Sequence, residues 1–433
     1  MRVFVIGLLF SLMNVSYAQE VEKKSLSDLY FMFVQNDKYL SREKRLLDVA
    51  GSRYDEVKSE YYPQVYASIK NLKNNREQHE IEERYKSHEK SIVAQQKILD
   101  IALLNKINKY NFSKDKSYYD YRQKIDERYI GFIDLIFNYL LSLDEYEITQ
   151  KEYKVVETNF QRIEEFWGRK LSTVIDLNEA AARKDVLEAN LLEIEQKINF
   201  LKLSIEEMIG HKLSFEIEKP SRELCVVNEK FLKSGFAYSL ENNYRIQSIR
   251  KNIASLESAV AEAKSEHAPT VSLQATIEKS NVGSAASRTS DYKNSTVGVN
   301  VYIPIFSGGS VNSRVKAAVD ELEAEKDLLT LTEKEIDREL ENIYKSLLIQ
   351  YKKNTALKKA LEYSEKARIA SEASYEYKLV DIVALLNSIK NEFATSRDLK
   401  KSEYDIYMSY LRSKQLIGEL DEKVIFAIGS CFD

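Results

Sequence analysis

Residues 297–309 read VGVNVYIPIFSGG, and the pattern of this stretch changes at its centre. In the first half, apolar residues alternate with Gly, Asn and Tyr, and a period of two predicts a strand with one apolar and one polar face. The second half brings Pro304 and the pair Gly308 and Gly309, which interrupt the strand and bend the chain. Residues with helical spacing follow. The sequence therefore predicts a strand that passes directly into a long helix.

Three other segments alternate in the same way, although one of them does so weakly. The expected ranges are strands over 64–71 and 91–98 around a highly charged loop over 72–90, and strands over 270–278 and 296–305 around a Ser/Asn/Gly-rich loop over 279–295. Each strand has one apolar face. The residues predicted to lie on these apolar faces, and to contact lipid, are Val65, Ile69, Val271, Leu273, Ile277, Val297, Val299 and Val301.

The two halves of the chain match each other weakly but collinearly at an offset near 207 residues. Residues 208–210 (MIG) correspond to 416–418 (LIG), and residues 62–65 (YPQV) correspond to 268–271 (APTV). Each half has the same order of helix, strand, loop, strand and long helical hairpin. The expected divisions are a signal peptide over 1–18, repeat one over 19–210, a linker over 211–221, repeat two over 222–418 and a tail over 419–433.

The helices are expected to be unusually long. The chain has only 4 Pro and 12 Gly in 433 residues, well below the usual share of about 5% and 7%. No Pro interrupts residues 101–168, which would make roughly 100 Å of helix. Apolar residues recur every three or four positions, as in coiled-coil seams. Hairpin tips are expected near 168–177 and 376–385, and the fold class is mainly α with a small β part.

The first residues predict export. Met1 and Arg2 give a basic start, an apolar run over 3–13 follows, and small residues precede the expected cut at Ser16 and Ala18. A buried N-terminal helix is the alternative interpretation.

Composition argues against catalysis and nucleic-acid binding. The formal net charge is −4, and the 4 His and 2 Cys are scattered without metal-ligand spacing. No phosphate-binding, dinucleotide-binding or nucleophile motif occurs. We therefore expect no enzyme, no metal, no cofactor and no nucleic-acid partner.

Exported strands with one apolar face suggest a pore. Four strands cannot close a barrel, because the smallest membrane barrels use about eight, and an open edge is not tolerated in lipid. Several chains must then share one barrel, and three chains would give twelve strands. The alternative is a soluble four-stranded sheet packed on helices.

Four segments resemble TolC-like outer-membrane efflux proteins. Residues 302–309 (YIPIFSGG) are similar to the second-repeat signature, and residues 268–271 (APTV) to the opening of the preceding strand. Residues 375–386 (YEYKLVDIVALL) and 171–177 (LSTVIDL) resemble the hairpin tips. The resemblance implies a homotrimer with a twelve-stranded barrel in the outer membrane of a Gram-negative bacterium and a helical barrel in the periplasm. It also implies docking of a periplasmic adaptor and an inner-membrane pump or ABC transporter at the tips.

The resemblance assigns roles to particular residues, and solvated helix ends are the alternative for those at the tips. Pro304, Gly308 and Gly309 form the strand-to-helix passage. Lys170 and Lys378 replace the family's tip glycine, so a turn of different shape is expected. The residues expected to dock the adaptor or gate the pore are Lys170, Thr173, Asp176, Lys378, Asp381, Ala384 and Asn387.

Two further expectations complete the sequence-based interpretation. Cys225 and Cys431 lie in an exported protein, so a disulfide between them is a hypothesis that the sequence leaves open. The chain is expected to be the exit duct of a tripartite efflux or type I secretion system. A periplasmic coiled-coil scaffold or adaptor without a pore is the alternative.

Overall fold

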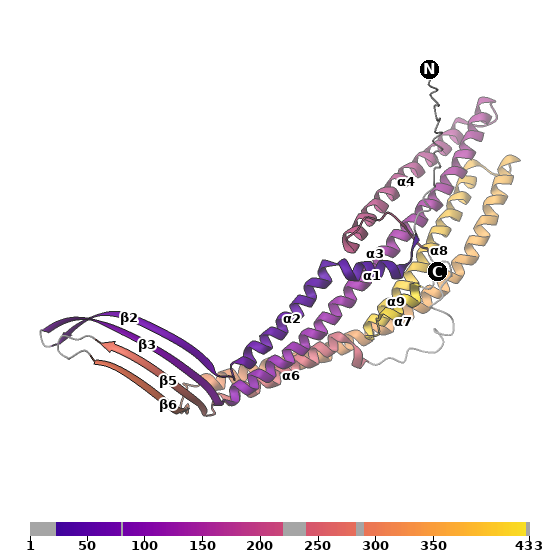
Figure 1. The fold of residues 1–433 in the computed structure, drawn as a ribbon. Helices are drawn as coiled ribbons and strands as arrows, with labels where there is room; N and C mark the ends of the chain where they lie inside the picture. Colours follow the sequence, from indigo (N-terminus) through magenta and orange to yellow (C-terminus); the bar gives the residue numbers. More distant parts are fainter. Residues whose placement is uncertain (1–22, 79–80, 220–239, 283–289, 430–433) are drawn as a thin grey trace, which may run out of the picture.

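The computed structural model describes residues 23–78, 81–219, 240–282 and 290–429. These residues form an elongated molecule, with a sheet at one end and two helical hairpins whose tips lie at the other (Figure 1). The predicted signal peptide, Cys225 and Cys431 lie outside the described residues.

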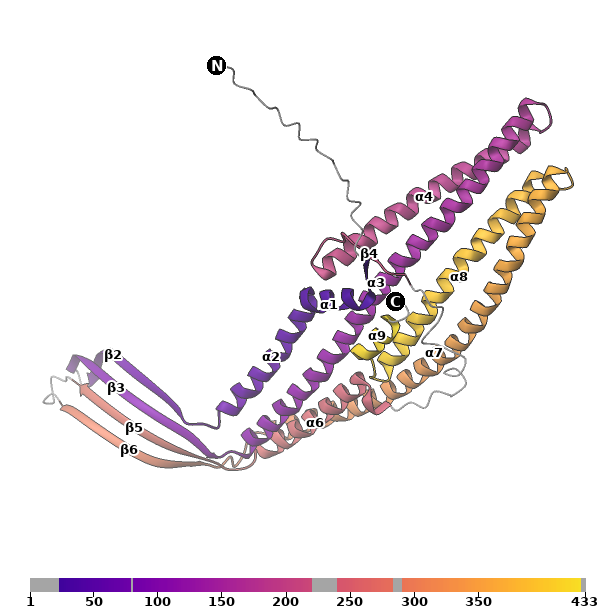
Figure 2. The same cartoon turned by 45° about the vertical axis from the view of Figure 1, so that its right-hand side comes forward.

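The sheet has four antiparallel strands in the order β2-β3-β5-β6. Their bounds are Gln64–Gln78 for β2, Ile81–Leu99 for β3, Thr270–Val282 for β5 and Ser290–Tyr302 for β6. Because β3 pairs with β5, each repeat contributes two neighbouring strands to one curved sheet (Figure 2).

The register joins the apolar positions of all four strands on one face. Val65 lies opposite Ala94, Ile92 opposite Ile277, and Leu273 opposite Val299. Directly opposed residues in an antiparallel pair point to the same side of the sheet. The result is a continuous apolar surface, which we call the apolar face, and a polar face behind it.

The expected loop over 72–90 is wrong, because strands occupy nearly all of it. β2 and β3 have 15 and 19 residues. The charged side chains misled the sequence interpretation: a backbone ladder needs no apolar side chains where both faces of a ribbon are exposed. The loop over 279–295 is shorter than expected for the same reason, since β5 continues to Val282 and β6 begins at Ser290. β6 ends at Tyr302 rather than at 305, before Pro304, which has no N–H to donate.

Two long hairpins make up most of the molecule. The first pairs α3 (Ile101–Gly168) with α4 (Val174–Ile209), and the second pairs α7 (Ser310–Glu376) with α8 (Ile382–Leu416). α3 and α7 have 68 and 67 residues, or about 100 Å each at 1.5 Å per residue. No helix in the described ranges is both long enough and apolar enough to cross a membrane.

Shorter elements surround the middle of the hairpins. α1 (Leu26–Asn36) and α2 (Lys38–Ser59) are separated at Asp37, whose side chain caps α2. α6 (Tyr244–Ser265) packs against α3 and α7. β1 (Lys23–Lys24) pairs in parallel with β4 (Glu216–Ile217). β4 lies within the expected linker. The expected tail contains α9 (Glu422–Gly429), which packs against α1.

The main core lies where α1, α3, α4, α8 and α9 meet. Phe33 and Phe132 stack there with ring centroids 4.2 Å apart, and both side chains are fully buried. Burial of this aromatic surface holds α1 against the middle of α3.

The two repeats form the same close joint just beyond their last long helix. Gly210 has φ 71°, and an added Cβ would lie 3.1 Å from Asn36. Gly418 has φ 70°, and an added Cβ would lie 2.1 Å from the carbonyl oxygen of Asn242, in the short helix η1 (Leu240–Asn242). Only glycine combines this backbone conformation with so close an approach.

Candidate functional site

The apolar face of the sheet is not covered by any other described part of the chain. Val297 is 75% exposed, and Val65 and Ile69 are each 68% exposed. Among the other residues predicted for this face, Val271 is half-buried, and Leu273, Ile277, Val299 and Val301 are exposed. So large an exposed apolar patch marks an interaction surface.

The polar face carries side chains that bond with one another. The Asn300 amide donates to Gln274 Oε1 on the neighbouring strand at 2.9 Å. Further along, Lys70 lies 3.7 Å from Glu89. One face of the sheet therefore suits lipid, and the other suits water.

The strand-to-helix passage differs between the repeats. In repeat two, Gly308 and Gly309 have φ 61° and 81°, and Gly309 precedes α7 without a side-chain cap. Ile305 and Phe306 are 94% and 88% exposed between β6 and the glycines. In repeat one, Asp100 alone separates β3 from α3 and caps the helix by accepting from Leu103 N–H at 2.9 Å. The glycines allow a wider change of direction than a single capping residue does.

The hairpin tips have the same backbone turn in both repeats. Lys170 has φ 58° and Lys378 has φ 55°, the only positive values at non-glycine residues in the described chain. The expectation of a turn of different shape is therefore wrong: both lysines take the left-handed conformation. That conformation costs a non-glycine residue about 1–2 kcal/mol, so the contacts around each turn must offset it.

The helices after the tips begin with different caps. Thr173 and Asp176 form a capping box, in which each side chain accepts from the other residue's backbone N–H. Burial alone would raise the pKa of Asp176, but hydrogen bonds from Thr173 and Ser172 outweigh it and lower the pKa below its ordinary value. In repeat two, Asp381 caps α8 by accepting from Ala384 N–H at 2.7 Å. Ala384 and Asn387 are exposed on the first turns of α8.

Two contacts join the tips to each other. Lys378 Nζ donates to the carbonyl oxygen of Leu171 at 3.4 Å. On the helices next to the tips, Arg162 of α3 lies 2.8 Å from Glu376 of α7. Both contacts are largely exposed, so each adds little stability by itself. Weak contacts of this kind can break and re-form without unfolding the helices.

A buried carboxylate joins the hairpins further from the tips. Glu152 on α3 is fully buried and binds Arg183 on α4 as well as Arg397 on α8, the latter at 2.8 Å. One carboxylate thus connects three helices from both hairpins. We call Glu152, Arg183 and Arg397 the hairpin clamp.

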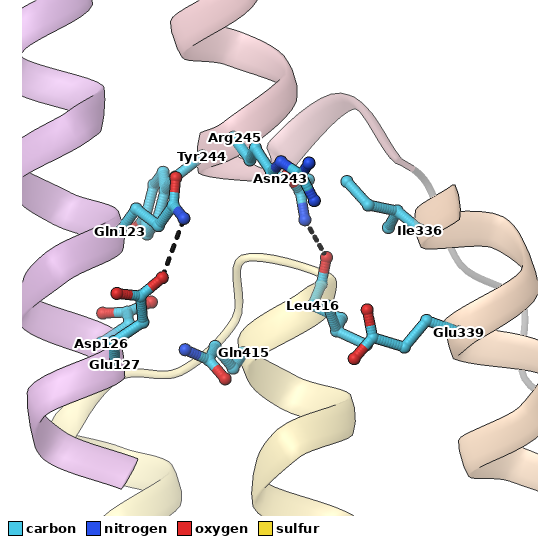
Figure 3. A pocket seen from close by; sticks show the side chains of 10 residues that line it. All are labelled: Gln123, Asp126, Glu127, Asn243, Tyr244, Arg245, Ile336, Glu339, Gln415 and Leu416. Atoms are coloured by element: carbon cyan, nitrogen blue, oxygen red, sulfur yellow. Dashed lines mark hydrogen bonds between the residues drawn. The ribbon is translucent and has the colours of Figure 1, made fainter. Parts of the chain in front are cut away.

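A cavity of about 220 Å³ lies near the joint of repeat two (Figure 3). Asp126 and Glu127 of α3 line it, facing the start of α6 and the end of α8, where the Asn243 amide donates to Leu416 O at 2.7 Å. Asp126 is 1% exposed, and neither of its carboxylate oxygens accepts a hydrogen bond from the described residues. Burial raises its pKa to about 7, and the charge of Arg122 only partly opposes this rise.

The sequence interpretation did not identify the hairpin clamp or Asp126. A signal existed for the clamp, because buried positions of α3 recur every three or four residues and one of them is a glutamate. The buried residues of this stripe are Thr149, Glu152, Val156, Asn159 and Ile163. Within the described ranges, no cluster of His, Cys, Asp or Glu could hold a metal ion.

Part of the chain matches a known protein family. The family described as outer membrane efflux protein matches residues 238–419, which span most of repeat two. The alkaline protease secretion protein AprF of Pseudomonas aeruginosa is 21% identical over 80% of this chain and 73% of its own length. Residues 238–419 therefore carry an outer membrane efflux protein domain, and the chain is similar to TolC-like proteins.

Two further similarities agree with this assignment. Outer membrane protein TolC of Escherichia coli is 20% identical over 68% of this chain, and the match spans 62% of TolC. The outer membrane protein VceC of Vibrio cholerae has the same fold, with a TM-score of 0.79 at 14% identity over 92% of this chain and 97% of that one. These similarities place the chain in the outer membrane, with a periplasmic extension.

Proposed function

We propose that three copies of this chain form the exit duct of a tripartite efflux or type I secretion system. The observation that carries the proposal is the sheet: it has an exposed apolar face, a polar face, and two unpaired edges at β2 and β6. Unpaired strand edges are not tolerated in lipid, because their N–H and C=O groups find no hydrogen-bond partner there. Among its described residues, the chain provides no further strand to pair with these edges.

Closure by copies of the same chain satisfies both edges. β6 of one copy would pair with β2 of the next, and three copies would give a barrel of twelve strands. The apolar face would then contact lipid, and the polar face would line a water-filled lumen. The long hairpins would continue this wall into the periplasm.

The tips are the proposed contact with the rest of the export system. Lys170, Thr173 and Asp381 are exposed at the end furthest from the sheet. A periplasmic adaptor and an inner-membrane pump or ABC transporter would dock there. The Lys378–Leu171 and Arg162–Glu376 contacts would hold the tips together until the partner separates them.

The relatives support both roles of such a duct. AprF is named as a protein of alkaline protease secretion, whereas the family match is to efflux proteins. Deleting the gene and measuring drug resistance beside the secreted proteins distinguishes the roles: efflux predicts lost resistance, and type I secretion predicts loss of one exported protein.

The test of the duct is native mass spectrometry of protein extracted from isolated outer membranes. A trimer is expected, with chain-to-chain crosslinks between cysteines placed at β2 and β6. A monomer or dimer in the soluble periplasmic fraction would contradict the duct and favour a scaffold without a pore.

A further inference from the structure

The apolar face ends at a row of lysines. On three neighbouring strands, Lys90 of β3 lies opposite Lys279 of β5, and Lys279 lies opposite Lys293 of β6. Because directly opposed residues share a face, all three point to the side of the apolar face. All three side chains are exposed. We call these residues the lysine row.

The row marks a boundary along the strands. Two residues nearer the helices, the same face presents Ile92 and Ile277 on β3 and β5, and Ser295 on β6. Two residues further out it presents His88, Asn281 and Asp291. One step of this kind is about 7 Å. The lysines therefore lie where an apolar band gives way to polar side chains.

The row is not neutralised by the described chain. None of the three lysines lies within ion-pair distance of a carboxylate of the described residues, and Asp291 is the only acidic side chain at an adjacent position of this face. Like charges directly opposite each other destabilise a sheet. An external anion would offset this repulsion.

Charge at this level of the sheet is sorted by face. The polar face carries Glu89 and Glu278, and the first of these is paired with Lys70. The two carboxylates closest to the row along its own strands thus point away from it.

We propose that the lysine row binds the phosphate groups of lipids in the outer leaflet of the membrane. The occupant must be an amphiphile: its acyl chains would lie on the apolar face, and its anionic head group would lie at the level of the row. Lysine side chains extend along apolar surface to place their ammonium groups at such a boundary. This inference rests on the proposed function, since it requires that the apolar face contacts lipid.

The test uses full-length protein extracted from the outer membrane, freed of lipid and titrated in detergent. The probes are diphosphoryl lipid A, the same lipid with its phosphates removed, and inorganic phosphate. Four proteins are compared: the wild type, the triple variant K90Q/K279Q/K293Q, the corresponding triple arginine variant, and K352Q/K353Q/K359Q. The last variant removes the same charge from exposed lysines of α7.

The wild type, the arginine variant and the α7 variant are expected to bind diphosphoryl lipid A alike. The row variant should bind it about a hundredfold more weakly, at roughly fivefold per lysine. All four should bind the dephosphorylated lipid equally weakly. If the triple variant fails to assemble, the single variant Lys279→Gln replaces it in the test. Its affinity for diphosphoryl lipid A is expected to fall about fivefold.

Three results would overturn the inference. One is a row variant that binds diphosphoryl lipid A as the wild type does; another is an equal loss in the α7 variant. The third is saturation of the row by inorganic phosphate at the affinity measured for the lipid. Native mass spectra from the same samples report the trimer: a trimer whose lipid binding is unaffected by the row variant contradicts this inference alone, whereas absence of a trimer in the wild type contradicts the proposed duct.

Discussion

Repeats one and two share a backbone but differ in what holds it. Each ends its hairpin turn with a left-handed lysine, at Lys170 and Lys378, and each closes its joint with a left-handed glycine, at Gly210 and Gly418. The polar contacts do not repeat. The buried Asp126 and Glu152 both lie on α3, whereas α7 buries no Asp or Glu among its described residues. Glu333 of α7, for example, is partly exposed and pairs with Arg250 at 3.2 Å.

The difference shows which constraints a duplicated fold keeps. Positions where the backbone needs an unusual φ or a close approach allow few residues, so both copies retain them. Side chains inside the hairpins can diverge, because each copy has a different neighbour. α3 packs on α2, α4, α6 and α8, whereas α7 packs on α6 and α8. Repeat one therefore supplies the buried polar groups that hold the two hairpins together.

The largest expected difference between the two joints comes from replacing the glycine of each with alanine. Gly418→Ala would place a Cβ 2.1 Å from the Asn242 carbonyl oxygen, while Gly210→Ala would meet a side-chain carbon at 3.1 Å. We expect losses of about 4 kcal/mol at Gly418 and about 2 kcal/mol at Gly210. Thermal unfolding followed by circular dichroism measures both. Equal losses would mean that the close approach to Asn242 does not matter.

The hairpin clamp gives the next largest effect. Glu152→Gln leaves Arg183 and Arg397 facing an uncharged partner, and we expect a loss of about 3 kcal/mol. Hydrogen exchange should rise in α4 and α8 together, since one carboxylate binds both. Glu341→Gln is the matched control, because Glu341 pairs with Lys345 on the exposed side of α7. If the control lost as much stability as Glu152→Gln, burial of the carboxylate would not explain the effect.

Asp126 should make repeat one sensitive to pH. Its pKa is raised to about 7 by burial, so the folded state holds the proton more tightly than the unfolded state, whose pKa is about 3.9. The contribution of Asp126 to stability is complete below about pH 4 and is lost as pH rises through 7, with a fall of roughly 2–3 kcal/mol between pH 5 and pH 8. Asp126→Asn should remove this slope, and Glu333→Gln should not. If stability still changed with pH to the same extent in Asp126→Asn, another group would be responsible for the pH dependence.

The tip lysines should give the smallest and most equal effects. Replacing Lys170 or Lys378 by glycine relieves the left-handed strain but adds backbone entropy to the unfolded chain, for a net gain of about 0.5–1 kcal/mol at each. Hydrogen exchange at the two turns measures the gain. A loss at Lys378 alone would show that its bond to Leu171 O outweighs the strain.

Sequence patterns identified the elements whose physical cause is local. Alternation in 297–301 and the Pro304, Gly308 and Gly309 signals come from side chains and backbone limits that act within a few residues. The long helices follow from the scarcity of Pro and Gly. The apolar face could be listed residue by residue for the same reason, because each strand carries its own alternation.

The remaining features depend on partners that are distant in sequence. Residues 72–90 form strands because a neighbouring strand supplies the hydrogen-bond ladder, and their charges give no sign of it. The left-handed lysines depend on the contacts that surround each turn. The hairpin clamp spans 245 residues between Glu152 and Arg397, and no spacing rule for a single helix predicts such a contact.

Among the described residues, the unequal length of the strands leaves the outer part of β2 and β3 paired only with each other. β5 pairs with β3 only as far as Ser87, so the register from Lys73 opposite Lys86 to Gln78 opposite Ile81 is a two-stranded ribbon. Both edges of such a ribbon are free to pair with another chain. Charged residues such as Lys73, Arg84 and Lys86 along these edges oppose that pairing. In an assembled duct, three ribbons would stand clear of the lipid as the parts of the protein most accessible to antibodies and proteases outside the cell.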